Sequence, residues 1–557
     1  MRTPADTIAS TREFLAASAI GAVLAIVMTW PLVTGIGHLG RTRDTDADGQ
    51  FSIWNVAWVA RTIVADPAHL FDANIYSPHK RTLAYSEANL VEGVLGVPVY
   101  WTTNNPWATL NVVMLFAFAS AYVCAFLLLR YLSADARAAA IAAAIFAFCP
   151  FVFAHLPHIQ LLMTGGIPLA LLLFHRTADE PSTSRGVLLG VALAVEALAC
   201  AYYGIFAGLA IGYAALLVAA RRRLWRSGEY WRAIAIAAVI AIAIVSPVFI
   251  VFLRVRAETG FARTLDDAIK WAANPSSYLA SAAHAHGWLL DYANRHFEPW
   301  TEVLFPGLSA ILLGSIGLIV AARAPRGDDR VRETGLLYGT LAAVAFWASL
   351  GPSAGLYRVL YYLPAFSFLR APSRIGLVVV LCLATLASLA IARGLRALPA
   401  RWQRFAAVAL GAVVVADTFV APLPFAEAPV LARPYALLAK LPRGIVAEFP
   451  FYGERIAYPL HAQYMLFSTS HWMPLVNGYS DVIPDDFRPA ARILDSFPSR
   501  DAFDVLAHHR VRYIGIHWDM FVNRADEIRD RLKPFAENLR VLASDDRMTL
   551  YEIVSFP

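Results

Sequence analysis

The sequence predicts a polytopic α-helical membrane protein with a small soluble α/β domain at its C-terminal end. Of its 557 residues, 58% are hydrophobic and only 16% are charged, and the mean hydropathy is +0.53. Soluble domains are about 45–50% apolar and about 25% charged. The excess apolar surface must therefore face lipid.

Apolar stretches near the membrane-spanning length recur along the chain. A helix needs roughly 20 such residues to cross a bilayer, and the pattern predicts about eleven spans. We place them near 14–33, 109–129, 138–154, 159–174, 186–201, 204–220, 232–253, 305–322, 335–350, 375–392 and 405–421. The least secure element is the turn at 201–204, for which one long buried helix is the alternative.

Basic residues in the short loops predict the orientation of these spans. Lys and Arg accumulate in cytoplasmic loops. The clusters are Arg2 and Arg12; Arg130 and Arg137; Arg176 and Arg185; Arg221, Arg222, Arg223 and Arg226; Arg323, Arg326 and Arg330; and Arg393, Arg396, Arg401 and Arg404. They occupy alternate connections if the N-terminus is cytoplasmic, which argues against a nucleic-acid groove. We expect a protein of the cytoplasmic membrane with 34–108, 254–304, 351–374 and the C-terminal end outside.

The composition changes after about residue 421, where spanning runs stop. We expect a membrane domain over 1–421, with a large first extracytoplasmic loop at 34–108, and an extracytoplasmic α/β domain over 422–557. Strands are expected at 444–449, 512–517 and 548–554, and helices at 434–440 and 525–532.

The first loop concentrates acidic and aromatic residues. Asp44, Asp46 and Asp48 directly follow the first span. Trp54 and Trp58 are one helical turn apart and share a face, which we expect at the membrane interface. A loop of about 75 residues is too long for a simple connector.

Several segments resemble bacterial membrane proteins of the GT-C glycosyltransferase superfamily. They include an acid six residues before Trp54 and ten before Trp58, and the runs LFDANIYSPHKRTLAYSEANL (70–90), GVPVYWTTNNPWATLN (96–111), EVLFPG (302–307), LPAFSFLRAPSRIG (363–376) and HWMPLVNGYSDVIP (471–484). The resemblance covers most of the chain. It implies a sugar donor linked to polyprenyl phosphate and a glycan, lipid or protein acceptor outside the membrane.

Such a transfer needs a carboxylate that takes the proton of the attacking hydroxyl. It also needs cations that stabilise the departing phosphate. One general base and a phosphate leaving group imply inversion at the sugar. Spacing to the tryptophans favours Asp48 as this acid, with Asp46 second and Glu87 as a partner.

Two other interpretations of the acids stay open. Asp44 and Asp46 could cap the helix that begins near Gln50. The run from Asp44 to Gly49 also matches the opening of an EF-hand calcium loop, although its twelfth position is Asn55 and not Glu. We do not expect true calcium-loop geometry, but divalent metal binding by Asp44, Asp46 and Asp48 remains an alternative.

Cations in other outer loops are candidates for phosphate binding. Arg370 and Arg374 precede the tenth span, where arginine reaches lipid headgroups either to bind phosphate or simply to snorkel. Arg254 and Arg256 end the seventh span and are weaker candidates.

Further polar residues lie at predicted outer turns or within spans. His155 and His158 could bind phosphate or acceptor, or form an ordinary polar turn, and Glu302 fits the family pattern. Glu196 lies within an apolar run, where an ionisable side chain suggests function unless Tyr202 or Tyr203 satisfies it.

In the C-terminal domain, His471, Trp472, Asn477, Gly478 and Tyr479 form a polar and aromatic patch. The patch predicts either an acceptor contact or a loop stabilised by aromatic residues.

The sequence thus favours an inverting glycosyltransferase at the extracytoplasmic face. A transporter or flippase of lipid-linked sugar is one rival, although intramembrane charges are sparse and no repeated halves are visible. A non-catalytic protein of envelope polymer assembly is the other.

Overall fold

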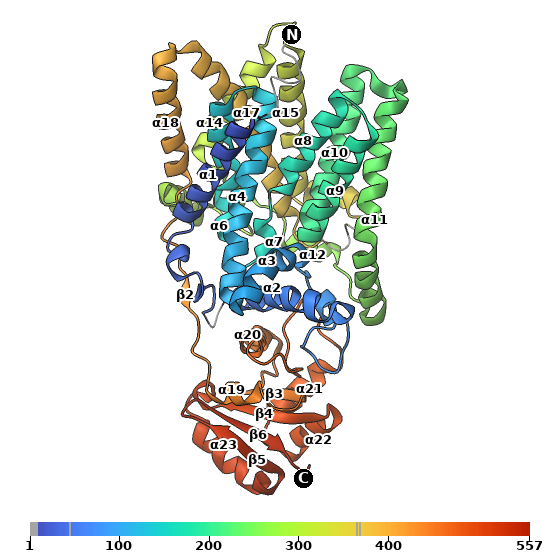
Figure 1. The fold of residues 1–557 in the computed structure, drawn as a ribbon, viewed down its shortest axis with the longest axis vertical. Coiled ribbons are helices and arrows are strands. Elements are labelled where there is room, and N and C mark those ends of the chain that lie inside the picture. Colours follow the sequence, from blue (N-terminus) through green and yellow to red (C-terminus); the bar gives the residue numbers. More distant parts are fainter. Residues whose placement is uncertain (1–8, 44–45, 364–365, 367–368) are drawn as a thin grey trace. The chain divides into compact units, whose positions relative to one another are not determined.

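The computed structural model describes residues 9–43, 46–363, 366 and 369–557. Each predicted span overlaps one or more helices (Figure 1). These are α1 (Thr11–Met28), α4 (Pro106–Ser133), α5 (Ala136–Ala147), α6 (Pro150–Ala154), α7 (Ile159–Leu162), α8 (Gly166–Asp179), α9 (Thr183–Ala199), α10 (Ala201–Arg222), α11 (Gly228–Thr259), α14 (Leu308–Ala322), α15 (Asp329–Ser349), α17 (Gly376–Ala397) and α18 (Ala400–Asp417).

Among the described residues, six helical segments are long and apolar enough to cross a membrane. They are α1, α4, Ala136–Ala154, α10, α11 and Pro372–Ala397, while α14 is a shorter apolar helix. The chain is therefore a multi-pass membrane protein whose predicted helix positions are confirmed. The number of spans stays a prediction.

The turn near Ala201 separates two helices. α9 ends at Ala199 and α10 begins at Ala201, because Cys200 between them adopts an extended backbone conformation. α9 packs against α10. The alternative of one long helix across this region is wrong.

Contacts divide the chain into two compact units. The first comprises 1–34, 114–247 and 262–423, and the second comprises 35–113, 248–261 and 424–557. Most of the first loop thus belongs to the same unit as the C-terminal residues.

The first unit is a helical bundle built around α17. Its segment Pro372–Ala397 is almost entirely buried, and it packs against α14, α15 and α5. Close approach of α14 depends on Gly317, since a Cβ there would lie 1.8 Å from the carbonyl oxygen of Leu386. Three short helices lie in the connections: α12 (Leu265–Lys270), α13 (Gly287–His296) and α16 (Leu356–Leu360).

The second unit contains the first-loop helices and a four-stranded sheet. The helices are α2 (Ala47–Ala65) and α3 (Leu90–Thr103), and a two-residue ladder joins β1 (Leu39–Gly40) to β2 (Ala426–Glu427). The sheet has the order β3-β4-β6-β5, with β3 parallel to β4 and the other pairs antiparallel. Its strands are β3 (Ile445–Phe449), β4 (Val511–His517), β5 (Leu539–Ser544) and β6 (Met548–Ile553).

These elements confirm the three predicted strands and both predicted C-terminal helices, α19 (Pro434–Leu438) and α23 (Ala525–Leu532). The structure adds β5 and three helices that the sequence pattern did not indicate: α20 (His461–Ser468), α21 (Phe487–Leu494) and α22 (Arg500–His508). The parallel β3 and β4 are almost wholly buried, as parallel strands usually are.

Candidate functional site

Asp46 lies at the start of α2 but does not cap it. Its side chain accepts no hydrogen bond from the helix backbone and instead accepts one from Arg41 Nη2 at 3.0 Å. Helix capping is therefore the wrong interpretation of this residue. Asp44 lies outside the described residues.

Asp48 stands in the first turn of α2, where the helix dipole favours a negative charge. The hydroxyl of Tyr479 donates a hydrogen bond to its Oδ1 at 3.0 Å. The Tyr479 ring also meets the edge of Phe51, with centroids 6.2 Å apart. Two independent contacts thus fix the tyrosine whose hydroxyl orients the carboxylate.

The calcium-loop alternative is contradicted by the backbone. Residues 47–65 form one continuous helix, so the segment cannot wrap around an ion as an EF-hand loop does. Asn55, at the twelfth position, donates its amide to the backbone carbonyl of Glu87 at 3.0 Å. Within the described part of the chain, no group of three or more His, Cys, Asp or Glu could hold a metal. Because Asp44 lies outside the described residues, metal binding by Asp44, Asp46 and Asp48 together stays a prediction.

Trp54 and Trp58 share a face of α2 as predicted, but they are buried in the core of the second unit. Their indole N–H groups donate to Asn74 Oδ1 at 3.0 Å and to the carbonyl of Leu70 at 2.9 Å. Their role is to fix α2 against the rest of the first loop. The expected position at the membrane interface is wrong.

A second polar cluster lies in the first unit, where three loops that the charge pattern predicts to be outside meet. His155 Nδ1 lies 2.8 Å from the carbonyl oxygen of Phe151, so this nitrogen must carry a proton. Its Nε2 lies 3.0 Å from Glu302 Oε1. One more proton must lie between this nitrogen and the carboxylate.

The charge state of Glu302 decides where that proton is. Burial raises the pKa of Glu302, but His155 and Arg374 together hold it below its usual range. The carboxylate form of Glu302 is therefore favoured. The side chains of His155 and Glu302 are only 7% and 11% exposed.

Arg374 is the residue with unmet hydrogen-bonding capacity in this cluster. Its side chain is 11% exposed, and its closest acidic oxygen is Glu302 Oε2, at 3.9 Å from Nε. The buried Nε has no hydrogen-bond acceptor among the described residues. The guanidinium lies over the ring of Tyr202 at 4.7 Å. A buried guanidinium with spare donors is suited to an anion.

Arg370 lies close to the same cluster. Its backbone N–H donates to the hydroxyl of Tyr202 at 3.0 Å, and its guanidinium lies over the ring of Trp271 at 5.6 Å. Tyr202 thus contacts both arginines. Its ring lies against the Arg374 guanidinium, and its hydroxyl accepts a hydrogen bond from the Arg370 backbone. Sequence reasoning named Tyr202 only as a partner for Glu196.

The remaining candidates are less closely tied to this cluster. The His158 ring lies 6.2 Å from that of His155. Arg254 is exposed on α11, in the second unit, and Arg256 is half-buried there. Glu196 is buried on α9 against the N-terminal turn of α8, where its Oε2 would lie 1.9 Å from a Cβ at Gly166. The Glu196 carboxylate therefore packs against Gly166 and not against Tyr202 or Tyr203.

The predicted patch at 471–479 mostly serves packing. Asn477 is fully buried and exchanges hydrogen bonds with the backbone of Glu448, and Trp472 Nε1 donates to the hydroxyl of Tyr100 at 3.1 Å. Of the five residues, Tyr479 is the one that contacts a predicted catalytic acid. No sequence signal linked it to Asp48, because the two are 431 residues apart.

No protein-family model matches the sequence, and no curated protein is similar to it. Solved structures of membrane glycosyltransferases do share its fold. The archaeal oligosaccharyltransferase AglB from Archaeoglobus fulgidus matches with a TM-score of 0.52 and 14% identity, over 95% of this chain and 72% of AglB. ArnT from Cupriavidus metallidurans matches with a TM-score of 0.51 and 16% identity, over 98% and 99% of the two chains.

The mycobacterial arabinofuranosyltransferase AftD matches with a TM-score of 0.57 and 14% identity, over 99% of this chain. The chain spans only 42% of the length of AftD. Together these likenesses show that the protein has the GT-C glycosyltransferase fold.

Proposed function

We propose that the protein transfers a sugar from a polyprenyl-phosphate donor to an acceptor outside the cytoplasmic membrane, with inversion at the anomeric carbon. The observation that carries this proposal is Arg374, a buried arginine whose Nε has no hydrogen-bond acceptor among the described residues. It lies on a fold shared with AglB, whose structure holds a dolichol-phosphate, and with ArnT, whose structure holds undecaprenyl phosphate.

In this proposal the cluster around Arg374 binds the donor phosphate. A phosphate oxygen would accept the hydrogen bonds that Glu302 is too distant to accept. His155 contacts Oε1 of Glu302, and Oε2 lies 3.9 Å from Arg374 Nε, so the guanidinium can still bind an external anion. The ring of Tyr202 limits the conformations of the guanidinium before the donor arrives, which reduces the entropy lost on binding.

Asp48 is the proposed general base. A carboxyl group at a helix N-terminus, held by the Tyr479 hydroxyl, is oriented to accept a proton from the acceptor hydroxyl. Asp46 is a poorer base because Arg41 already binds it. Glu87 is retained as a positioning residue near Asn55.

The proposed topology follows the basic clusters. The N-terminus and the basic loops are cytoplasmic, and residues 34–108 and 422–557 are extracytoplasmic. The donor would be presented from the outer leaflet, because nucleotide sugars are not available there.

The test compares Asp48→Asn with Asp46→Asn in the purified protein, reconstituted in nanodiscs with a panel of polyprenyl-phosphate sugars. Asn has the shape of Asp but cannot take the proton, so Asp48→Asn should lower the transfer rate by about 10²–10⁴-fold. Asp46→Asn should retain most of the activity. Near-normal transfer by Asp48→Asn would remove Asp48 from the mechanism.

The same pair distinguishes transfer from the rival functions. Lipid-linked sugars and surface glycans of a deletion strain should change, and Asp48→Asn should fail to restore them. If the purified protein moves lipid-linked sugar across a bilayer without transferring it, the flippase interpretation replaces ours. A role in metal binding predicts that all three acids are needed and that EDTA abolishes the activity.

A further inference from the structure

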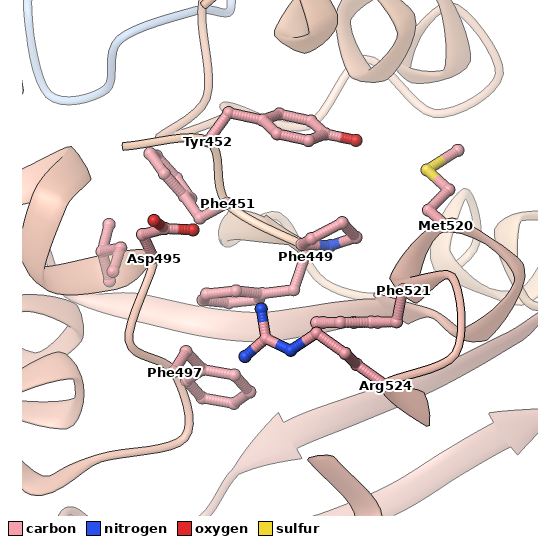
Figure 2. A pocket seen from close by; sticks show the side chains of 10 residues that line it. Phe449, Phe451, Tyr452, Asp495, Phe497, Met520, Phe521 and Arg524 are labelled. Atoms are coloured by element: carbon pink, nitrogen blue, oxygen red, sulfur yellow. The ribbon is translucent and has the colours of Figure 1, made fainter. Parts of the chain in front are cut away.

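A pocket of about 230 Å³ lies in the C-terminal part of the second unit (Figure 2). Its walls come from the end of β3 and the residues after it (Phe449 to Tyr452), from three residues after β4 (Met520, Phe521 and Arg524), and from the end of α21 with the residues that follow it. β3 and β4 are parallel, so their carboxyl ends adjoin. Ligands of open α/β sheets commonly bind at this edge.

The wall of the pocket is largely aromatic. Phe449 and Phe497 stack with centroids 4.0 Å apart, and Phe451, Tyr452 and Phe521 are the other aromatic residues of the lining. Flat apolar faces with a small number of polar groups are typical of small-molecule sites. The C–H-rich face of a sugar ring packs well on such a surface.

Two charged side chains supply the polar groups. Figure 2 shows the Arg524 guanidinium among the aromatic rings and Asp495 on the same pocket. Arg524 Nε donates to Glu527 Oε2 at 3.2 Å, which anchors the side chain while its terminal N–H groups stay available for a ligand. Burial raises the pKa of Asp495 against the opposing effect of Arg524, and both side chains remain exposed to solvent at the pocket.

The two charges do not neutralise each other by direct contact, since no ion pair within 4 Å joins them in the described structure. A phosphate would meet repulsion from Asp495, and an apolar ligand would leave both groups without hydrogen bonds. A polyol both donates and accepts, so its hydroxyl groups can bind Arg524 and Asp495 together.

We propose that this pocket binds one ring of a neutral saccharide and so holds the glycan acceptor of the reaction. Its volume is below the range of about 300–1,000 Å³ that drug-sized ligands occupy, which suits a single sugar ring. The choice of saccharide over other polar ligands rests on the proposed glycosyltransferase function. The pocket itself does not involve Asp48 or Arg374.

Saturation-transfer NMR with the full-length protein in nanodiscs tests this proposal. The probes are the methyl glycosides of glucose, mannose, galactose and arabinofuranose, together with an N-acetylated peptide amide. At least one glycoside should bind saturably. Arg524→Gln and Met520→Phe should each weaken its binding by about tenfold or more, because the first removes charged donors and the second fills the cavity.

Arg443→Gln is the matched control, since Arg443 is exposed before β3 and does not line the pocket. It should bind the glycoside like the wild type, and unchanged circular dichroism should establish that the pocket variants are folded. Absence of glycoside binding, unchanged binding in both pocket variants, or binding of the peptide alone would each overturn the proposal. If glycosides bind but no sugar transfer occurs, the pocket stands and the proposed function fails.

Discussion

The hydroxyl of Tyr479 donates a hydrogen bond to Asp48 Oδ1 at 3.0 Å, although the two residues are 431 positions apart in the chain. Tyr479 belongs to the C-terminal residues and Asp48 to the first loop, and both are part of the second unit. The proposed general base is thus held by a residue outside the membrane-spanning part of the sequence. In the proposed mechanism, this hydrogen bond gives the C-terminal residues a part in catalysis that packing alone would not.

Tyr479→Phe should lower kcat by about tenfold, with the KM for the donor nearly unchanged. The ring would still pack against Phe51, but the carboxylate would lose a hydrogen bond worth about 1.5–3 kcal/mol. Steady-state kinetics of the reconstituted protein measure the effect. Tyr551→Phe, on β6, is the control and should leave kcat unaltered. An unchanged kcat in Tyr479→Phe would show that Asp48 needs no such support.

Arg374→Gln should weaken donor binding by about tenfold or more. Gln keeps part of the side-chain volume but removes the charge that would bind phosphate, and a hydrogen bond to a charged group contributes about 1.5–3 kcal/mol. Titration with undecaprenyl phosphate gives the affinity. Arg370→Gln should weaken it as well, and the exposed Arg254→Gln should not. Equal affinities in all three variants would return the arginines to an interfacial, structural role.

The C-terminal sheet should lose stability on acidification because of His461. Its Nε2 lies 3.2 Å from the carbonyl of Tyr452, and its Nδ1 lies 3.2 Å from the amide nitrogen of Asn477. The ring therefore donates from Nε2 and accepts at Nδ1, which requires the neutral form. Burial lowers the pKa of His461 to about 4.

The direction of this change in stability with pH follows from the linkage between proton binding and unfolding. An unfolded histidine has a pKa of about 6.5, so between that pH and 4 the unfolded chain binds more protons than the folded one. Stability should be full above about pH 6.5 and fall as the pH is lowered toward 4. Thermal unfolding followed by near-ultraviolet circular dichroism measures it. A His461→Gln variant should be less stable at pH 7 but less sensitive to acid, and an equal pH dependence in both proteins would contradict this origin.

The helices and the central strands could be predicted because their signals are local. Apolar runs of spanning length and alternating apolar strands depend on neighbouring residues alone, and both were found where expected. The amphipathic α21 and the exposed edge strand β5 lack a strong apolar signal and were missed.

Candidate residues could be listed from sequence, but their partners could not. Arg374 and Glu302 were both predicted, yet the role of Tyr202 in holding the two arginines depends on how α10 meets a distant loop. The same holds for Tyr479, since only the fold brings it to Asp48. Buried Trp54 and Trp58 show the converse: a helical face that looks interfacial can pack inside the protein.

The predicted topology has support in the ion pairs of the first unit. Arg222, at the end of α10, pairs with Asp179 at the end of α8 and with Glu333 near the start of α15, each at 2.6 Å. Three loops predicted to be cytoplasmic therefore meet at one end of the bundle. His155, Glu302 and Arg374 join three loops predicted to be outside. Each cluster contains loops of a single predicted side, as a correct alternation requires.

Cysteine labelling can determine which end faces the cytoplasm. Leu224→Cys lies in a basic loop predicted to be cytoplasmic, and Arg500→Cys lies in the C-terminal residues. A membrane-impermeant maleimide added to intact spheroplasts should label position 500 and not position 224, while both should react after permeabilisation. Tyr292→Cys, exposed on α13 of the first unit, should react from outside as well. Native Cys149, Cys200 and Cys382 are buried and should contribute little background.

Labelling of position 224 in intact spheroplasts would invert the predicted orientation. It would place Arg374 at the cytoplasmic face, where a donor presented from the outer leaflet could not reach it.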